Sequence, residues 1–339
     1  MQRSIHRVFS LCACCVLVLM FSGAAVAQYY SYDILVANIP GKGVHTDTLL
    51  ANPWGLAYGP GAPFWVSDEA SGWSTLYNRN GVAEPLQVII PSSSGSGWGT
   101  PTGIVYNPSS EFQIENWTSA FLFATLDGTI SGWSHFEPNT ALIGARQPGA
   151  MYTGLAISKR KSGNFLYAAD FANNKVDVYD ANFHWVKSFT DPSLPTGFAP
   201  FGIQNIGGRI YVAFASQSGG SGGYIEIFHE DGTFVKRLVK GAPLNQPWGI
   251  ALAPDDFGPL SGTLLVSNNV DAGTINGFDP ATGAMVGTLK NRNGGVIKIN
   301  GLWGIAFGGG TLANGKKNQL FFAAGPNDTD GYFGVINSH

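Results

Sequence analysis

Short apolar segments alternate with turn residues along most of the chain, and one phrase recurs among them. The phrase is a small or polar residue, then Pro-x-Gly or a close variant, then an aliphatic residue. Its glycines follow one another at spacings of 48, 51, 48, 47 and 55 residues. The six copies are Pro53-Trp54-Gly55-Leu56, Pro101-Thr102-Gly103-Ile104, Tyr152-Thr153-Gly154-Leu155, Pro200-Phe201-Gly202-Ile203, Pro247-Trp248-Gly249-Ile250 and Leu302-Trp303-Gly304-Ile305. Repetition at this length predicts a β-propeller with six blades of four antiparallel strands.

The rest of each unit has the pattern of short strands. Period-2 alternation of apolar and polar residues, rich in β-branched and aromatic side chains, is a strand signal. Compact apolar runs predict second strands at residues 64–66, 121–124, 165–168, 210–213, 264–266 and 320–323. Alternating segments predict third strands at 75–77, 129–133, 176–179, 224–228 and 274–278, and fourth strands at 86–90, 185–189, 234–239 and 285–289. No segment has a 3.6-residue apolar stripe, so the predicted fold class is all-β.

The sixth unit lacks a fourth strand. After its third strand, at residues 333–336, only residues 337–339 remain. Residues 32–36 precede the first unit and have strand character, so they are expected to supply the missing strand. Such closure protects a sheet edge that would otherwise promote aggregation. A single propeller domain is therefore expected over residues 28–339.

The first 27 residues have the three parts of a signal peptide. Arg3 and Arg7 form a basic region, and residues 8–21 form an apolar run that is short for a membrane span of about 20 residues. Ala25-Val26-Ala27 matches a cleavage site before Gln28. We expect an exported protein, whether periplasmic, at the cell surface or secreted. The alternative is an uncleaved membrane anchor.

The positions of the cysteines and the net charge exclude some sources of stability and disfavour some partners. Cys12, Cys14 and Cys15 all lie in the expected signal peptide, so the mature chain has no disulfide and depends on core burial alone. Cleavage lowers the Lys and Arg count from 19 to 17, against 22 Asp and Glu, for a formal net charge of −5. This balance disfavours a nucleic-acid partner. No later apolar run is long enough to span a membrane.

Candidate ligand-binding residues follow from propeller geometry. The loops before the first strand and after the second strand of each blade emerge on one face, around the mouth of the central channel. Polar side chains from all blades meet there, which makes it the default ligand site. The candidates before first strands are Asn52, Asn245 and Asn300, and those that end second strands are Asp68, Asp170 and Asn268. The expected ligand is a small molecule, a glycan or a protein.

The repeat resembles the NHL-repeat and gluconolactonase-like group of six-bladed propellers. It is more closely similar to an uncharacterised family of exported bacterial propellers, over nearly all of residues 28–339. The phrases that carry this resemblance are Asn52-Pro53-Trp54-Gly55-Leu56, residues 126–133, residues 247–254 and Ala324-Gly325-Pro326-Asn327-Asp328. The resemblance implies a six-bladed fold and an exported location. It brings no catalytic residues, because that family has no established activity.

Asp68, Asp170 and Asn268 end the second strands of alternate blades, so their oxygens could hold a hard cation such as calcium. The resemblance to gluconolactonase-like enzymes implies a divalent metal that polarises a lactone carbonyl. The competing interpretation is that these side chains cap the turn after the second strand through local hydrogen bonds. The sequence favours turn capping.

Two other features have a structural and a functional interpretation. Trp54, Trp248 and Trp303 recur at one repeat position, where they could stack on a sugar or, as we expect, fill the wedge between neighbouring blades. Residues 219–223 match G-x-S-x-G, but a glycine linker that runs into a strand lacks the strand–turn–helix context of a nucleophile elbow.

The leading functional hypothesis is an exported, non-catalytic scaffold that binds a ligand or protein and needs no cofactor. The alternative is a metal-dependent lactonase-like or esterase-like hydrolase that acts at the channel mouth. No motif in the sequence decides whether the chain is an enzyme.

Overall fold

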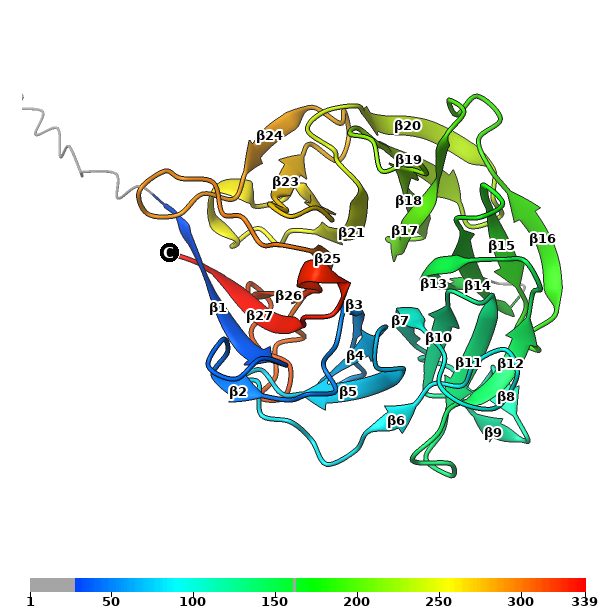
Figure 1. Cartoon of the computed structure of the whole chain (residues 1–339). Helices are drawn as coiled ribbons and strands as arrows, with labels where there is room; N and C mark the ends of the chain where they lie inside the picture. The colour runs from blue at the N-terminus through cyan, green and yellow to red at the C-terminus, as the bar shows by residue number, and fades with distance from the viewer. Residues whose placement is uncertain (1–27, 161–162) are drawn as a thin grey trace, which may run out of the picture.

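The computed structural model describes residues 28–160 and 163–339, so the expected signal peptide lies outside the described residues. Six sheets stand around a central axis, as the six-fold repeat predicts (Figure 1). The strand nearest the axis in each blade contains the recurring phrase. These inner strands are β3 (Pro53–Ala57), β7 (Pro101–Tyr106), β13 (Tyr152–Arg160), β17 (Phe198–Ile206), β21 (Pro247–Leu252) and β25 (Leu302–Phe307).

Each inner strand is followed outward by antiparallel partners in chain order. The second strands are β4 (Phe64–Asp68), β10 (Phe121–Thr125), β14 (Gly163–Asp170), β18 (Arg209–Ser216), β22 (Leu264–Asn268) and β26 (Leu320–Ala324). The third strands are β5 (Trp73–Tyr77), β11 (Thr129–Trp133), β15 (Lys175–Tyr179), β19 (Tyr224–His229), β23 (Ile275–Phe278) and β27 (Tyr332–Ser338). Blades 1 to 5 end in β6 (Val88–Ile89), β12 (Leu142–Arg146), β16 (Trp185–Phe189), β20 (Phe234–Lys240) and β24 (Met285–Thr288).

The N-terminal strand completes the sixth blade, as predicted. Strand β1 (Tyr30–Ala37) pairs antiparallel with β27, with Tyr30 opposite Ser338 and Ala37 opposite Tyr332. It is longer than the expected residues 32–36, because the pairing continues to both ends of β27. The short β2 (His45–Thr46) adds a parallel partner outside β1. The first and last described segments are thereby joined in one sheet, which closes the ring.

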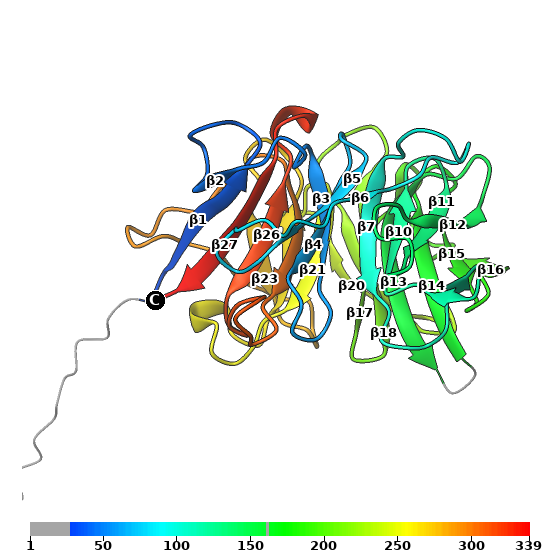
Figure 2. The same cartoon turned by 90° about the horizontal axis from the view of Figure 1, so that it is seen from below.

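The remaining elements mark the two faces of the ring. The hairpin β8 (Gln113–Ile114) and β9 (Trp117–Thr118) is inserted in blade 2. The helix η2 (Pro326–Asp328) follows a second strand, whereas η1 (Gly258–Leu260) follows an inner strand, and Figure 2 shows them on opposite sides. We call the side of η2 the mouth face and the side of η1 the rear face. No helix within residues 28–160 and 163–339 has the length and apolarity needed to cross a membrane.

The glycine of each phrase lets neighbouring inner strands approach closely. A Cβ built on Gly55 would lie 2.6 Å from the carbonyl oxygen of Thr102, and one on Gly202 would lie 1.9 Å from that of Trp248. The other four glycines of the phrase, Gly103, Gly154, Gly249 and Gly304, face the next inner strand in the same way, and Gly304 returns to Trp54. The repeat therefore favours glycine because a Cβ would lie too close to the backbone of the next inner strand, least severely at Gly154, where the distance is 3.1 Å.

Apolar side chains fill the spaces between blades. One cluster joins Val105 and Leu122 of blade 2 to Leu155 and Leu166 of blade 3, all of them buried. Full burial of side chains of this size stabilises the fold by about 1.5–3 kcal/mol each. Stability therefore comes from blade-to-blade packing, which holds the inner strands around the channel.

Candidate functional site

An irregularity in the inner strands determines which side chains face the axis. In β3, the pairing with β4 shifts between Pro53, opposite Asp68, and Leu56, opposite Val66. Such a bulge places an extra residue on one strand and re-aims its side chain. Register shifts lie at the phrase in all six blades. The residues directly before the phrase glycines are Trp54, Thr102, Thr153, Phe201, Trp248 and Trp303.

Four of these side chains meet and form an aromatic plug, defined here as Trp54, Phe201, Trp248 and Trp303. Trp54 and Trp303 stack with ring centroids 3.5 Å apart. Phe201 lies 6.1 Å from Trp54, and Trp248 lies 6.2 Å from Trp54. The rings come from blades 1, 4, 5 and 6, and blades 1 and 4 are on opposite sides of the ring. The prediction that the tryptophans fill wedges between neighbouring blades is therefore wrong, because the bulge turns them to the axis.

The plug is fixed by hydrogen bonds between blades. Trp303 Nε1 donates to Asn52 Oδ1 at 3.1 Å, and Trp248 Nε1 donates to the carbonyl oxygen of Thr153 at 2.9 Å. Trp54 Nε1 is buried and has no hydrogen-bond partner among the described residues. Two of the three indoles thus tie one blade to another, which gives the plug a fixed geometry.

The predicted site residue Asn52 is hydrogen-bonded to the plug. Its backbone has a φ of 46°, a left-handed conformation that asparagine tolerates well. Its Nδ2 donates to Glu69 Oε2 at 2.8 Å, so one carboxamide links Glu69 to Trp303. Burial raises the pKa of Glu69, the hydrogen bond from Asn52 lowers it, and the charge of Asp328 raises it. Glu69 was not among the predicted site residues, although it directly follows Asp68.

Asp68 is fully buried in blade 1. Its Oδ2 accepts hydrogen bonds from the backbone N–H and the hydroxyl of Thr75, at 3.0 and 2.8 Å. Its Oδ1 has no partner among the described residues. Burial raises the pKa of this carboxyl well above its ordinary value, and the charge of Asp47 raises it further, against the hydrogen bonds from Thr75. A carboxyl that favours its proton is a poor ligand for a cation.

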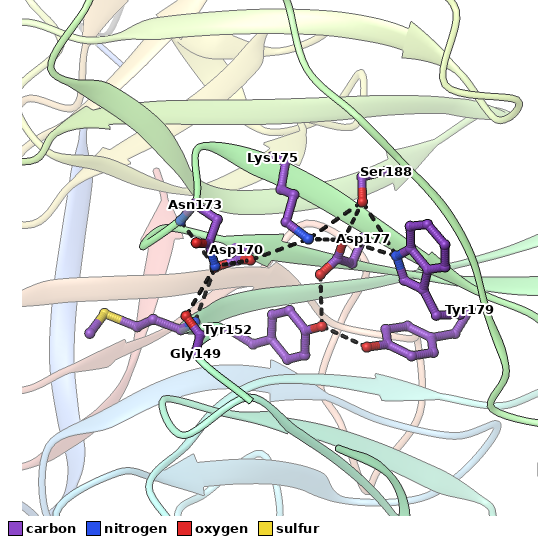
Figure 3. Close-up of polar contacts among 10 residues, drawn as sticks. Gly149, Tyr152, Asp170, Asn173, Lys175, Asp177, Tyr179 and Ser188 are labelled. Carbon is purple, nitrogen blue, oxygen red and sulfur yellow. Dashed lines mark hydrogen bonds and ion pairs between the residues drawn. The ribbon is translucent and has the colours of Figure 1, made fainter. Parts of the chain in front are cut away.

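Asp170 is also buried, and its oxygens belong to the turn of blade 3 (Figure 3). Its Oδ1 accepts from the backbone N–H groups of Met151 and Asn173, at 3.1 and 3.3 Å. Its Oδ2 accepts from Asn173 Nδ2 at 2.7 Å and lies 3.7 Å from Lys175 Nζ. These are the contacts of a turn-capping side chain, as the sequence favoured.

The other three predicted site residues are asparagines of blades 5 and 6. Asn268 Oδ1 accepts from the backbone N–H of Asn245 at 2.9 Å, and its Nδ2 donates to the carbonyl oxygen of Pro243. Asn245 and Asn268 are therefore brought together, within blade 5. Asn300 is exposed on the loop that leads to β25. In the described part of the chain, the hydrogen bond between Asn245 and Asn268 is the one that joins two of the six predicted residues.

The donor set does not fit a divalent cation shared by three blades. Of the candidate oxygens, those of Asp170 bond to its turn and to Met151, and that of Asn268 bonds to the loop before β21. Asp68 offers one oxygen without a partner among the described residues, on a carboxyl whose pKa is raised. Within residues 28–160 and 163–339, no group of three His, Cys, Asp or Glu side chains is arranged to hold a metal ion. We therefore derive no chemical step through a metal.

A buried polar network beside Asp170 was not anticipated. Asp177 accepts from Lys175 Nζ at 2.7 Å, Ser188 Oγ at 2.5 Å and Tyr152 OH at 2.9 Å, and Tyr152 OH accepts from Tyr179 OH at 2.6 Å (Figure 3). Burial raises the pKa of Tyr179 to about 12. All these groups are satisfied by one another, so the network holds blade 3 together. The alternating pattern of residues 176–179 gave the strand but not the partners.

Beyond the plug, the channel is open toward the rear face. A cavity of about 380 Å³ runs along the inner strands and is lined by residues of all six. The plug residue Trp248 closes it on the mouth side, and Tyr58, Leu252 and Phe307 line its rear side. The aliphatic residues that follow the phrase glycines all line it: Leu56, Ile104, Leu155, Ile203, Ile250 and Ile305.

Solved structures share this architecture. A gluconolactonase, XC5397 from Xanthomonas campestris, superposes with a TM-score of 0.57 at 13% identity, over 86% of this chain and 89% of that chain. A streptogramin B lyase superposes with a TM-score of 0.55 at 15% identity, over 92% of this chain and 98% of that chain. At such identities the likeness shows the fold alone. It agrees with the resemblance to gluconolactonase-like propellers.

No protein-family model matches the chain. Three uncharacterised proteins of Acanthamoeba polyphaga mimivirus are similar in sequence. R648 is 32% identical over 91% of this chain and 80% of its own length, and L690 is 30% identical over 92% and 86%. R640 is 36% identical over 81% of this chain, which spans about half (53%) of R640. These relatives are viral, so the expected bacterial origin is not supported. The chain belongs to the family that includes the uncharacterised proteins R648 and L690.

Proposed function

We propose that the chain is an exported, non-catalytic propeller that binds a small molecule, a glycan or a protein. One observation carries this proposal: the polar side chains at the mouth are used to hold the fold. Asp170 caps its turn, Asn268 holds the loop before β21, and Asn52 links Glu69 to the plug. Catalysis requires a reactive group held next to a substrate-sized space. Here the aromatic plug occupies that space on the axis.

The names of the structural neighbours do not change this proposal. One is a gluconolactonase and one is a lyase, but propellers support catalytic and non-catalytic functions on the same fold. A metal-dependent hydrolase would need Asp68, Asp170 and Asn268 to turn toward one ion. That movement would break the contacts of Asp170 with its turn and those of Asn268 with the loop before β21, and it would require Asp68 to ionise in a buried place. The acidic net charge of the mature chain also favours a partner other than nucleic acid.

The test is metal analysis of the purified protein together with a screen of lactone and ester hydrolysis, with and without chelator. We expect no chelator-sensitive turnover. Chelator-sensitive turnover that disappears in Asp170→Asn would overturn the proposal. Asp279→Asn is the matched control, because Asp279 caps an exposed turn through Ala281 and Thr282 in the same chemical way.

Export is part of the same proposal. The signal-peptide pattern predicts cleavage between Ala27 and Gln28, and β1 begins at Tyr30. Cleavage at this bond would leave the ring-closing strand intact. Mass spectrometry of protein recovered outside the cytoplasm should find Gln28 at the N-terminus. Residues 8–21 retained in a membrane fraction would instead favour the anchor.

A further inference from the structure

We infer that the rear half of the central channel is a binding site for an uncharged, elongated amphiphile. This inference rests on the proposed binding function and names its site and ligand class. The cavity of about 380 Å³ lies within the range of about 300–1,000 Å³ that is usual for small-molecule sites. Trp248 of the plug closes its inner end, so a ligand enters from the rear face and stops at the plug.

The lining determines the charge of the ligand. Among the described residues that line the cavity, none has a charged side chain. An ion that enters such a space loses its water and gains no counter-charge, which opposes its binding. A neutral molecule avoids that cost. The site therefore selects against charge.

The lining also determines the polarity of the ligand. Six aliphatic side chains, one from each blade, supply apolar surface. Each inner strand has one sheet neighbour in the described chain, so the backbone N–H and C=O groups on its other edge face the axis without a sheet partner. Gln204 adds a side-chain amide. A ligand with an apolar body and a few hydroxyl, amide or carbonyl groups matches both kinds of surface.

The cavity continues beyond the end of the channel, which favours an elongated molecule. A second hollow, of about 660 Å³, lies at the rear face and shares Tyr58, Leu252 and Phe307 with the first. Asp255 and Lys317 line this outer hollow. Charged groups thus begin where the channel opens to solvent, so the buried end of the ligand is the neutral one.

The experiment compares two fluorescent probes with the same rings. N-phenyl-1-naphthylamine is neutral, and 8-anilino-1-naphthalenesulfonate has an added sulfonate. We expect the neutral probe to bind the purified chain at one site, with at least tenfold higher affinity than the sulfonate. Equal affinities, or tighter binding of the sulfonate, would overturn the inference.

Two variants test whether the neutral probe binds in the channel. Gln204→Trp fills the channel from an exposed position on β17 and should weaken binding of the neutral probe at least tenfold. Gln87→Trp, at an exposed glutamine before β6, is the matched control and should leave binding unchanged. Unchanged binding in Gln204→Trp would overturn the inference.

Leu252→Lys gives a second measurement that does not depend on filling the core, because Leu252 is 46% exposed at the rear opening. The added charge should reduce the preference for the neutral probe by at least threefold, and an unchanged preference would contradict the proposed site. These outcomes are separate from the hydrolysis screen. Turnover would refute the non-catalytic function, whereas a failure of probe binding would refute only the channel site.

Discussion

The two ends of the central channel differ although the same six strands build both. At the mouth end, four aromatic rings fill the axis and the polar residues turn back into their own blades. At the rear end, aliphatic side chains leave a cavity of about 380 Å³. Both ends come from one phrase: the residue before the glycine forms the plug in four blades, and the residue after it lines the cavity in all six. The channel is therefore closed where the phrase has large aromatic side chains and open where it has smaller aliphatic ones.

The largest expected loss of stability is at the plug, which closes the mouth end. Trp303→Ala removes the ring that stacks on Trp54 at 3.5 Å and the indole that donates to Asn52. Loss of a buried Trp side chain should lower the free energy of unfolding by about 3–5 kcal/mol. Chemical denaturation measures the loss. Trp98→Ala, at a tryptophan that is 65% exposed, should cost less than about 1 kcal/mol. Similar losses in the two variants would show that the plug does not hold the ring.

The boundary between the two ends of the channel lies at the glycines of the phrase. Gly202 and Gly154 occupy the same repeat position but differ in how closely the next strand approaches them. A Cβ on Gly202 would lie 1.9 Å from the carbonyl oxygen of Trp248, whereas one on Gly154 would lie 3.1 Å from that of Phe201. Gly202→Ala should destabilise the protein by about 1–3 kcal/mol or more, because backbone must move. Gly154→Ala should cost less, since a few tenths of an ångström suffice. Thermal unfolding compares them, and equal losses would mean that the strands adjust freely.

The blade count and ring closure could be read from the sequence because they depend on local pattern. The repeat spacing gave six blades, and the missing last strand indicated β1 as the closing element. The plug could not be predicted in the same way. Whether Trp54 faces a neighbouring blade or the axis depends on a one-residue shift in pairing, and alternation alone assumes regular pairing.

The contacts of the site residues could also be predicted only where they are local in the sequence. Turn capping was correctly expected for Asp170, which accepts from the backbone N–H of Asn173 in the turn after its strand. It was not correct for Asn268, whose carboxamide bonds to the backbone of Pro243 and Asn245 in the loop before β21. Glu69 and Asp177 were missed, since their importance comes from partners far along the chain or across a strand pair, such as Asn52 and Tyr152. Sequence spacing shows which residues are close in the chain, but not which are buried together.

Asn52 tests the link between the mouth residues and the plug. Asn52→Ala leaves Trp303 Nε1 and Glu69 Oε2 without a hydrogen-bond partner and places alanine at a φ of 46°. We expect a loss of about 1–3 kcal/mol in the free energy of unfolding. Asn52→Gly removes the same hydrogen bonds but accepts the backbone conformation, so it separates the two causes. If Asn52→Gly is as stable as the unmodified chain, the carboxamide does not support the plug.

Substitution of Asp68 tests whether this carboxyl binds a cation or is simply buried. The two possibilities predict opposite changes in the free energy of unfolding at pH 8. Burial raises the pKa of Asp68, so the folded protein holds this proton more tightly than the unfolded chain does. Its contribution to the free energy of unfolding therefore falls as pH rises above the ordinary pKa range of a carboxyl, by at most about 1.4 kcal/mol per pH unit. Asp68→Asn removes this dependence and should stabilise the protein at pH 8 but not at pH 4.

Asp279→Asn provides a control with the opposite sign. Backbone and hydroxyl hydrogen bonds from Thr282 lower the pKa of the exposed Asp279, so its charged form stabilises the fold above the ordinary pKa range. That variant should lose stability at pH 8 and change little at pH 4. Denaturant titrations of both variants at the two pH values, with calcium and with chelator, complete the test. A carboxylate that bound calcium would make Asp68→Asn less stable at pH 8 when calcium is present. A gain in stability that calcium does not alter would mean that Asp68 belongs to the packed interior of blade 1.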